Sequence, residues 1–337
     1  MKKITSGLLI VLGITMLNPI KANAAWKENS AGYWYTEGSS YATGWRNIDN
    51  SWYYFDGTGY MKTGWIKDKD KWYYLSSNGN MEETGWIKDG VNYYYLNSDG
   101  TMACDTIVDN CFVDSNGEWV ENNEWKDKKY NALGDSITKG INPSNDYQVM
   151  TGNRYSDIIQ RCLKLSTANN YGIEGTTIVH QYDNNGMIDR YQSMSDDADL
   201  ISVFGGTNDF ASNAPMGEIN SGNNNEFKCA FNNLIKGLIE KYPSKKIFVI
   251  TPIPRHDATI DGKVANANGY KLQDYVNAEI EICNMNGIQV LNLYDGMLGI
   301  TPDNEDEKKA YMPDGVHPNV DGMYIVSKRI IEFINKL

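Results

Sequence analysis

Aromatic residues recur at a nearly constant interval through the first third of the chain, and this repeat constrains the fold more than any other feature. Four tryptophans spaced by 19, 20 and 21 residues open the units: Trp26, Trp45, Trp65 and Trp86. A second aromatic follows each one after seven positions: Tyr33, Trp52, Trp72 and Tyr93. Turn pairs such as Asp56-Gly57 and Asn78-Gly79 separate short aromatic runs. Each unit therefore predicts a β-hairpin that must stack on its neighbours, which gives an all-β hairpin-repeat solenoid.

The rest of the chain has a different rhythm. All nine tryptophans of the 337 residues lie between Trp26 and Trp125. From Lys128 onward, apolar runs alternate with segments in which apolar residues have helical spacing. The runs predict buried parallel strands at 130–133, 200–204, 247–253 and 288–293, and the spacing predicts helices at 155–165, 226–242, 272–284 and 323–337. This alternation predicts an α/β fold with a doubly wound parallel sheet, whose ligands bind at the carboxyl ends of the strands.

The N-terminus has the pattern of a secretory signal peptide. Lys2 and Lys3 precede an apolar run, and Ala22-Asn23-Ala24 supplies small residues for cleavage, so we assign residues 1–24 to the signal. No other stretch approaches the ~20 apolar residues of a spanning helix, and we expect a secreted protein that does not span the membrane. The net charge of −12 argues against a nucleic-acid partner.

The five cysteines form no zinc-binding pattern. There is no Cys-x-x-Cys and the three histidines are scattered, so we expect no metal site. Cys104 and Cys111 are close enough in sequence to bridge a small loop in an exported protein, and either a disulfide or two thiols fits this spacing.

Ser136 is the candidate nucleophile. It follows the apolar run that ends at Gly134-Asp135, where a glycine permits a sharp turn and backbone NH groups stabilise negative charge. Gly-Asp-Ser also occurs in ordinary turns, so the assignment depends on the residues downstream.

Those downstream residues stand at strand ends or in loops. Asn208, in Gly205-Gly206-Thr207-Asn208-Asp209, offers a side-chain amide, and Gly175 offers a backbone NH after a sharp turn. Asp314 precedes His317 by three residues, so its carboxylate can bind Nδ1 and leave Nε2 for a serine. His180 and His256 are rivals for the base, but His256 has no carboxylate at the same offset.

Taken together, Gly134-Asp135-Ser136, Gly175, Gly206-Thr207-Asn208-Asp209 and Asp314-x-x-His317 resemble the four blocks of the GDSL, or SGNH, hydrolases. Ile137 stands where the family name has Leu. The resemblance implies a three-layer, flavodoxin-like fold and no cofactor. It also implies a nucleophile Ser136, a base His317, an orienting carboxylate Asp314 and an oxyanion hole from the Ser136 NH, Gly175 NH and Asn208.

The first third, from Trp26 to Met102, resembles the choline-binding and glucan-binding repeats of Gram-positive cell walls, through its Gly-Trp, aromatic-pair and Gly-x-Met pattern. The resemblance implies aromatic cages that bind choline-bearing teichoic acid or a glycan. We name the candidate ligand-binding residues as Trp45, Trp52, Trp65, Trp72, Trp86 and Tyr93.

These patterns predict a signal (1–24), wall-binding repeats (25–118), a linker (119–127) and a hydrolase domain (128–337). We expect a secreted serine esterase at the cell wall or surface of a Gram-positive bacterium, which acts through an acyl-Ser136 intermediate. Its first substrate class is O-acetyl groups on carbohydrate or peptidoglycan. A lipase or lysophospholipase acting on lipid esters is one alternative, and a non-catalytic wall-binding surface protein is another.

Overall fold

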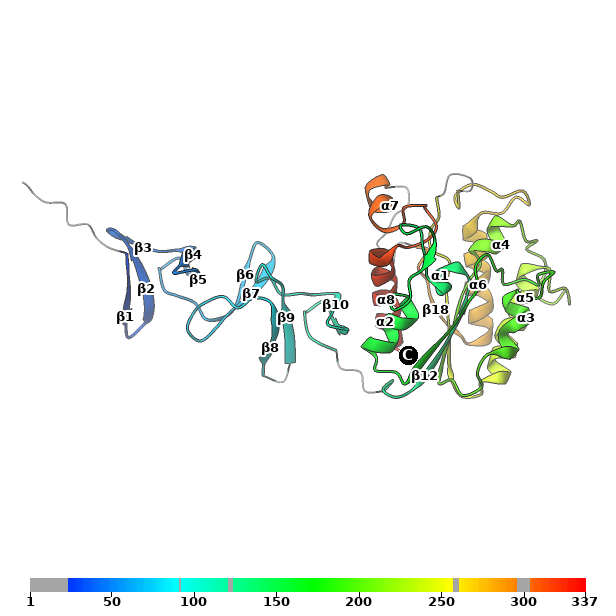
Figure 1. The fold of residues 1–337 in the computed structure, drawn as a ribbon, viewed down its shortest axis with the longest axis horizontal. Helices are drawn as coiled ribbons and strands as arrows, with labels where there is room; N and C mark the ends of the chain where they lie inside the picture. Colours follow the sequence, from blue (N-terminus) through cyan, green and yellow to red (C-terminus); the bar gives the residue numbers. More distant parts are fainter. Residues whose placement is uncertain (1–23, 91, 121–123, 257–260, 296–303) are drawn as a thin grey trace, which may run out of the picture. The chain divides into compact units, whose positions relative to one another are not determined.

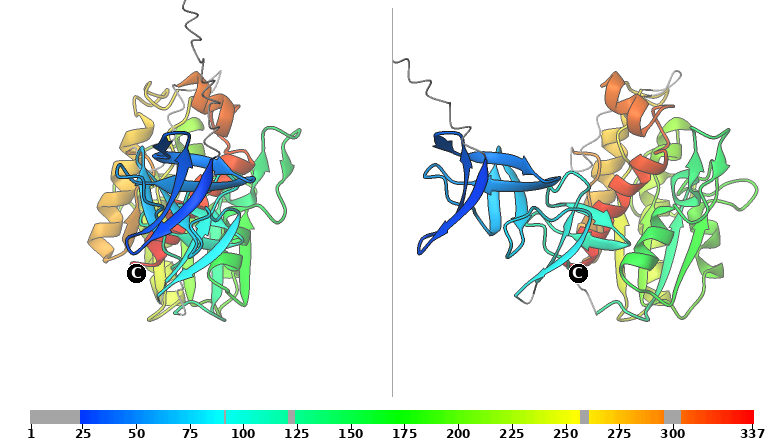
Figure 2. Two further views of the ribbon diagram at one scale, coloured as in Figure 1. Left: turned by 90° about the vertical axis from the view of Figure 1, so that its left-hand side faces the viewer. Right: turned by 60° about the vertical axis from the view of Figure 1, so that its left-hand side comes forward.

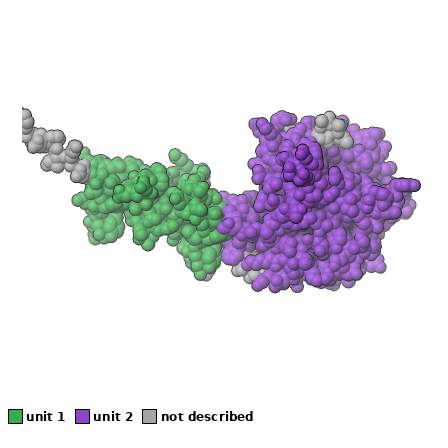
Figure 3. Space-filling view, viewed as in Figure 1, with its two compact units in different colours: residues 1–103 green, residues 104–337 purple. Residues whose placement is uncertain are grey.

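The computed structural model describes residues 24–90, 92–120, 124–256, 261–295 and 304–337. The chain divides into two compact units, Met1–Ala103 and Cys104–Leu337 (Figure 3). Except for its last residue, the predicted signal peptide lies outside the described residues. No helix in the described part of the chain is long and apolar enough to cross a bilayer.

The first unit is a series of antiparallel β-hairpins, drawn in blue to cyan in Figure 2. Its strands are β1 (Ala25–Asn29), β2 (Gly32–Glu37), β3 (Ser40–Tyr41), β4 (Gly44–Ile48), β5 (Ser51–Phe55), β6 (Gly64–Asp68), β7 (Lys71–Leu75), β8 (Gly85–Asp89) and β9 (Asn92–Leu96). The β4–β5 turn has φ of 51° at Asp49 and 65° at Asn50. Positive φ at both positions is typical of a type I′ turn, whose twist matches that of the strands.

Successive hairpins are joined by backbone hydrogen bonds. The NH of Met81 donates to the carbonyl of Trp52 at 2.7 Å, and the NH of Met102 donates to that of Trp72 at 2.8 Å. Gly79 has a φ of 84°, in the left-handed region, and a Cβ there would lie 2.1 Å from the sulfur of Met61, so this turn favours glycine. These contacts confirm the predicted all-β arrangement of stacked hairpins.

The second unit is built on a five-stranded parallel sheet in the order β15-β12-β16-β17-β18. The strands are β12 (Lys129–Gly134), β15 (Thr167–Gly172), β16 (Leu200–Phe204), β17 (Lys246–Ile250) and β18 (Gln289–Leu291). Numbered along the sheet's own chain order, this is 2-1-3-4-5, the flavodoxin-like order. The strand order reverses between β12 and β16, which places the expected ligand site at their carboxyl ends.

Helices cover both faces of this sheet (Figure 1). On one face, α2 (Tyr155–Cys162) and α8 (Val320–Ile334) share an apolar core with β12. On the other face lie α3 (Met187–Arg190), α5 (Phe227–Lys241) and α6 (Leu272–Asn286), which pack around a second core. The predicted three-layer α/β fold is confirmed.

The sequence did not predict the edge strand β15. Its residues Thr-Ala-Asn-Asn-Tyr-Gly are mostly polar and none is fully buried, so they lack the apolar run by which the other strands were found. Pairing with β12 over six residues, rather than burial, makes this segment a strand.

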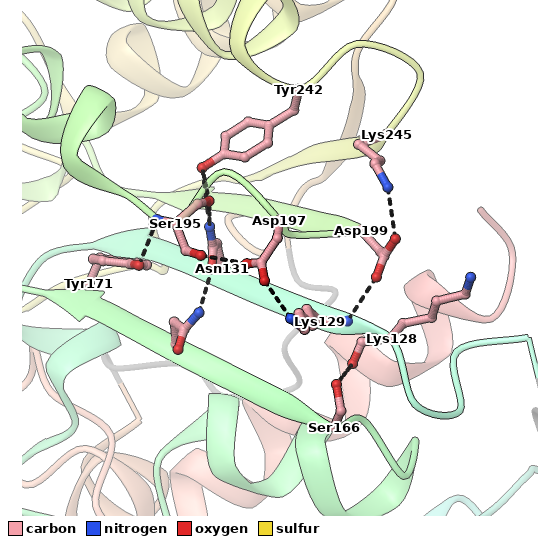
Figure 4. Close-up of polar contacts among 11 residues, drawn as sticks. Lys128, Lys129, Asn131, Ser166, Tyr171, Ser195, Asp197, Asp199, Tyr242 and Lys245 are labelled. Carbon is pink, nitrogen blue, oxygen red and sulfur yellow. Dashed lines mark hydrogen bonds and ion pairs between the residues drawn. The ribbon is translucent and has the colours of Figure 1, made fainter.

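Polar contacts fix the amino end of β12 (Figure 4). The backbone NH of Lys129 donates to Asp199 at 3.0 Å. Asn131, fully buried, donates through Nδ2 to the carbonyl of Ser195 at 2.8 Å and to the hydroxyl of Tyr242 at 3.1 Å. These bonds satisfy a polar side chain inside the sheet and hold the strand in register with its neighbours.

A final hairpin, β10 (Thr106–Val108) with β11 (Cys111–Val113), belongs to the second unit. Phe112 lies in the core that α2 and α8 share, and Trp125 is 4% exposed in the same core. Arg161 Nε donates to Asn110 at 2.7 Å, and Lys328 pairs with Asp105 at 2.8 Å. The predicted boundaries place this hairpin among the repeats (25–118) and Trp125 in the linker (119–127); in the structure, Phe112 and Trp125 are buried in the core that includes α2 and α8.

The disulfide considered between Cys104 and Cys111 is not formed, and Cys104 is an exposed free thiol. Strand register explains why, because Cys111 faces Val108 across the hairpin. Cys104 precedes the first strand and therefore lies beyond the Thr106–Val113 pair.

We predict that fragment 104–337 is more stable than fragment 128–337. The shorter fragment loses Phe112 and Trp125, and removal of a buried Phe or Trp side chain costs about 3–5 kcal/mol. Its melting temperature should be lower by roughly 10 °C in thermal scans monitored by helix circular dichroism. Equal melting temperatures would show that the hairpin contributes nothing to the α/β core.

Candidate active site

Ser136 begins a short helix, α1 (Ser136–Lys139), directly after β12. Asp135 caps this helix and accepts the NH of Ile137 at 2.9 Å. A Cβ at Gly134 would lie 1.9 Å from Thr138 Oγ1, so no other residue fits there without rearrangement. The glycine and the cap thus fix Ser136 at the carboxyl edge of the sheet.

His317 reaches Ser136 from the loop that precedes α8. Its Nε2 lies 2.8 Å from Ser136 Oγ, and its Nδ1 lies 2.7 Å from Asp314 Oδ2. Asp314 Oδ1 accepts the NH groups of Val316 at 2.9 Å and of His317 at 2.8 Å. Burial would raise the pKa of Asp314, but its hydrogen bonds with His317 and Val316 outweigh this effect and hold the pKa below its usual range. The line of three side chains has the geometry by which a serine passes its proton to an imidazole.

The two other histidines also have carboxylate partners. His180 Nδ1 lies 2.6 Å from Asp189 Oδ1, and His256 Nδ1 lies 3.1 Å from Asp261 Oδ2. In the sequence, His256 has no carboxylate three residues before it, as His317 has in Asp314. In the structure its partner is Asp261, five residues after it. Of the three histidines, His317 is the one with a hydrogen bond to Ser136.

Gly175 and Asn208 follow the two strands that flank β12. Gly175 has a φ of 71°, which favours glycine, after β15. Asn208 lies on α4 (Thr207–Ala211) after β16, and its Nδ2 donates to the carbonyl of Thr176 at 2.9 Å. An amide nitrogen carries two hydrogens, so this bond leaves one for a substrate oxygen.

The repeat unit gathers its aromatic residues in successive clusters. The ring centre of Trp45 lies 6.4 Å from that of Trp52 and 4.9 Å from that of Tyr73 in the next hairpin. Trp65 has the same arrangement, with its ring centre 6.4 Å from that of Trp72 and 4.9 Å from that of Tyr94. Trp52 and Trp72 remain 44% and 40% exposed, so both clusters are open to solvent.

The third cluster differs. Trp86 packs against Tyr95 at 5.3 Å, and Tyr93 replaces the second tryptophan. The ammonium of Lys88 lies 5.4 Å from the Tyr93 ring centre. The side chain of Lys88 therefore makes a cation–π contact with this ring within the chain itself.

Comparison with protein families agrees with both units. Residues 132–325 match the model of the GDSL-like lipase/acylhydrolase family. The chain belongs to this family. Residues 42–82 and 86–119 match models of the choline-binding repeat, so the second match includes the hairpin that packs on the hydrolase unit.

Several solved structures are similar to this GDSL-like hydrolase. A Lactobacillus plantarum protein is 30% identical, with 63% of this chain and 98% of that chain covered and a TM-score of 0.56. A possible lipase from Chitinophaga pinensis is 24% identical over 62% and 98% of the two chains, with a TM-score of 0.49. Choline binding protein F from Streptococcus pneumoniae is 40% identical over 29% and 34%, with a TM-score of 0.27. No curated protein matches the chain.

Sequence reasoning missed Arg190, which organises the active-site end of the hydrolase sheet. Its guanidinium donates to the carbonyl of Gly134 at 2.6 Å and to Thr176 Oγ1 at 3.3 Å. It also donates to the carbonyl of Tyr171. Burial lowers its pKa to about 10, so it stays charged at neutral pH. Arg190 ties the nucleophile strand to the Gly175 loop, and no motif marks it in the sequence.

Among the described residues of the hydrolase unit, three carboxyl groups are fully buried: Asp135, Asp209 and Glu279. Burial raises the pKa of Asp135 to about 6 and of Asp209 to about 7, although Asp209 accepts the NH groups of Ile178 and Val179. Burial also raises the pKa of Glu279 well above its usual range. The described residues contain no group of side chains placed to hold a metal ion.

Glu279 lies on the inward face of α6, and a Cβ at Gly206 would come within 2.5 Å of its Oε1. Neither oxygen has a hydrogen-bond partner among the described residues. The sequence offered one sign of this burial: Glu279 has the helical spacing that places it on the same face of α6 as the apolar residues Tyr275, Val276, Ile282 and Cys283. A charged residue is normally expected on the exposed face, so this sign was not sufficient to predict a buried glutamate.

We predict that Glu279→Gln flattens the pH dependence of stability. The native pKa is raised, so folding takes up a proton, and the stability present below about pH 4 is lost as pH rises toward the native pKa. A neutral amide removes up to about 1.4 kcal/mol per pH unit of this loss. Urea unfolding followed by helix circular dichroism should show the variant gaining on the parent as the pH rises above about 5.

The control is Glu281→Gln, an exposed position on the same helix, paired with Lys228. It should follow the parent at every pH. If Glu279→Gln has the same pH slope as the parent, Glu279 is ionised in the folded protein and its buried setting is compensated by water.

Proposed function

We propose that this hydrolase is a secreted serine esterase that removes acyl groups, O-acetyl groups in the first place, from carbohydrate or peptidoglycan at a Gram-positive cell wall. Membership of the GDSL-like family makes the chain an ester-bond hydrolase. The hydrogen-bonded line Ser136–His317–Asp314 is the observation that carries the assignment of roles.

In this mechanism, His317 Nε2 takes the proton of Ser136 as Oγ attacks the ester carbonyl carbon. Asp314 holds Nδ1–H and stabilises the imidazolium that forms. The NH groups of Ser136 and Gly175 and the amide of Asn208 stabilise the oxyanion. His317 then protonates the leaving alcohol, and water releases the acyl group from Ser136 by the same steps in reverse order.

The repeats support a substrate at the wall. Their clusters of Trp45, Trp52 and Tyr73 and of Trp65, Trp72 and Tyr94 are open aromatic sites of the kind that binds a quaternary ammonium. An enzyme held on choline-bearing teichoic acid meets acylated wall glycan at high local concentration. A lipase or lysophospholipase remains the second candidate because the family includes acylhydrolases of lipids by name. A non-catalytic surface protein fits less well, because the three catalytic side chains are already aligned.

We expect hydrolysis of acetylated xylan or acetylated peptidoglycan fragments, and of p-nitrophenyl acetate, to disappear in Ser136→Ala. Asn208→Ala should lose roughly 10²- to 10³-fold in kcat, as for one oxyanion donor. His317→Ala should abolish turnover, whereas His256→Ala, the matched histidine with its own carboxylate, should retain it. Acetate release and p-nitrophenol release measure these rates.

If a folded Ser136→Ala variant still hydrolyses these esters, Ser136 is not the nucleophile. Loss of activity in His256→Ala with retention in His317→Ala would move the base to His256. Faster hydrolysis of long-chain p-nitrophenyl esters and lysophospholipids than of acetylated glycans would favour the lipase candidate.

We predict that free choline elutes the intact protein from a quaternary-amine resin. Trp65→Ala should weaken retention, because it opens one of the two clusters that keep both tryptophans. Trp34→Ala is the control, because Trp34 packs on Tyr60 and lies outside both clusters. Restoring a tryptophan with Tyr93→Trp alone should add little, since Lys88 remains in place.

Elution of the protein by soluble glucan, with no effect of choline, would assign the clusters to carbohydrate instead. Retention that is unaffected by Trp65→Ala would place the binding site elsewhere on the chain.

A further inference from the structure

A small hairpin directly follows the nucleophile helix α1, and Tyr147 of its turn lies beside His317. Its strands are β13 (Ile141–Asn142) and β14 (Gln148–Val149), which pair antiparallel. Gly140, which caps α1, accepts the NH of Met150 at 2.8 Å, so both ends of the hairpin are held next to the helix of Ser136. The hairpin therefore has a fixed position relative to the nucleophile.

Tyr147 stands at the end of the turn in this hairpin. Its ring centre lies 6.2 Å from that of His317, with an angle of 85° between the planes. The charge of nearby Asp314 raises the pKa of the Tyr147 hydroxyl. The side chain is nevertheless 52% exposed, so it is held beside the catalytic side chains while much of its surface remains open.

The backbone of Tyr147 is also unusual. Its φ is 56°, in the left-handed region that an aromatic residue rarely adopts, and Asp146 before it has a φ of 45°. Hydrogen bonds from the NH of Asn145 to Asn142 O and from that of Gln148 to Asn145 O hold the turn in this form. Positive φ at both central positions is that of a type I′ turn, which Asn, Asp and Gly normally occupy, so a tyrosine at the second position is unusual.

The surroundings of Tyr147 favour one kind of ligand. Ser144, Asn145, Asp146 and Gln148 are all exposed and polar. An acyl chain would need an apolar trough, which this polar turn does not provide. A pyranose ring combines an apolar C–H face with hydroxyl groups around its rim, and it matches an exposed aromatic ring set among amides and carboxylates.

We propose that Tyr147 is the stacking platform for the sugar ring that carries the scissile ester. This inference rests on the proposed function and deepens it, because it assigns the alcohol side of the substrate to the β13–β14 hairpin. The ring binds the pyranose face while Ser136 attacks the ester carbonyl beside it.

The test compares Tyr147→Ala and Tyr147→Phe with the control Tyr182→Ala, which removes a tyrosine that is fully exposed in the same unit. With acetylated xylo-oligosaccharide, Tyr147→Ala should raise KM about tenfold and change kcat little. Tyr147→Phe keeps the ring and should resemble the parent, as should Tyr182→Ala. With p-nitrophenyl acetate, which has no sugar, Tyr182→Ala should react at the parent rate, and Tyr147→Ala should lose much less of its kcat/KM than it loses with the saccharide.

A binding measurement separates this inference from the reaction itself. In the Ser136→Ala background, acetylated xylo-oligosaccharide is titrated calorimetrically with and without Tyr147→Ala, so that the repeats are identical in both proteins. Loss of the active-site binding event with Tyr147→Ala supports the platform, even if the parent enzyme does not cleave this saccharide and the proposed function fails.

Other outcomes overturn the inference. If the parent cleaves the saccharide ester and Tyr147→Ala leaves its KM unchanged, the function stands and the platform does not. Equal loss on saccharide and p-nitrophenyl esters would mean that Tyr147 acts through Asp314 and His317. Loss confined to long-chain p-nitrophenyl esters would place Tyr147 on the acyl side, and no saccharide binding by either protein would reject the platform.

Discussion

The parallel pairing of β12 between β15 and β16 is the constraint on which the active site depends. Both neighbours align with β12 residue by residue, so that Gly134 lies beside Gly172 on one side and Phe204 on the other. The loops after these strands therefore emerge at the same edge. The segments that carry Ser136, Gly175 and Asn208 follow these three strands and so begin at that edge, where the strand order reverses at β12.

Burying a charged side chain near that edge is unfavourable, and the buried side chains differ in how many hydrogen bonds compensate them. Arg190 is compensated by carbonyl oxygens of two strands and by Thr176, and Asp209 by two backbone NH groups. Glu279 has no such partner in the part of the chain that the structure describes, and it avoids the cost of a buried charge by keeping its proton. Burial therefore shifts the pKa values of Arg190, Asp209 and Glu279 toward their neutral forms. The carboxylate of Asp314, nearer the surface, stays ionised.

The last choline-binding repeat joins two kinds of architecture. Its sequence matches the repeat model, yet its Phe112 side chain is buried with α2 and α8 of the hydrolase unit. Earlier hairpins bury their faces on one another because each has a similar neighbour. The final hairpin has no repeat after it, and its apolar face packs on the α/β core instead. A terminal repeat thus serves as part of the catalytic unit.

The sequence by itself determined the local parts: the hairpin period, the buried strands, the two resembled families and the identity of Ser136, Asp314 and His317 as candidates. Periodicity and short motifs suffice for these because they depend on neighbours in the chain. Only the tertiary structure decided that His317, 181 residues away, contacts Ser136, that polar β15 is a strand, and that Glu279 faces inward. It also decided that Arg190 and Tyr147 border the site and that Cys104 is unpaired with Cys111. These outcomes depend on strand pairing, hairpin register and helix orientation, which arise from contacts between distant segments.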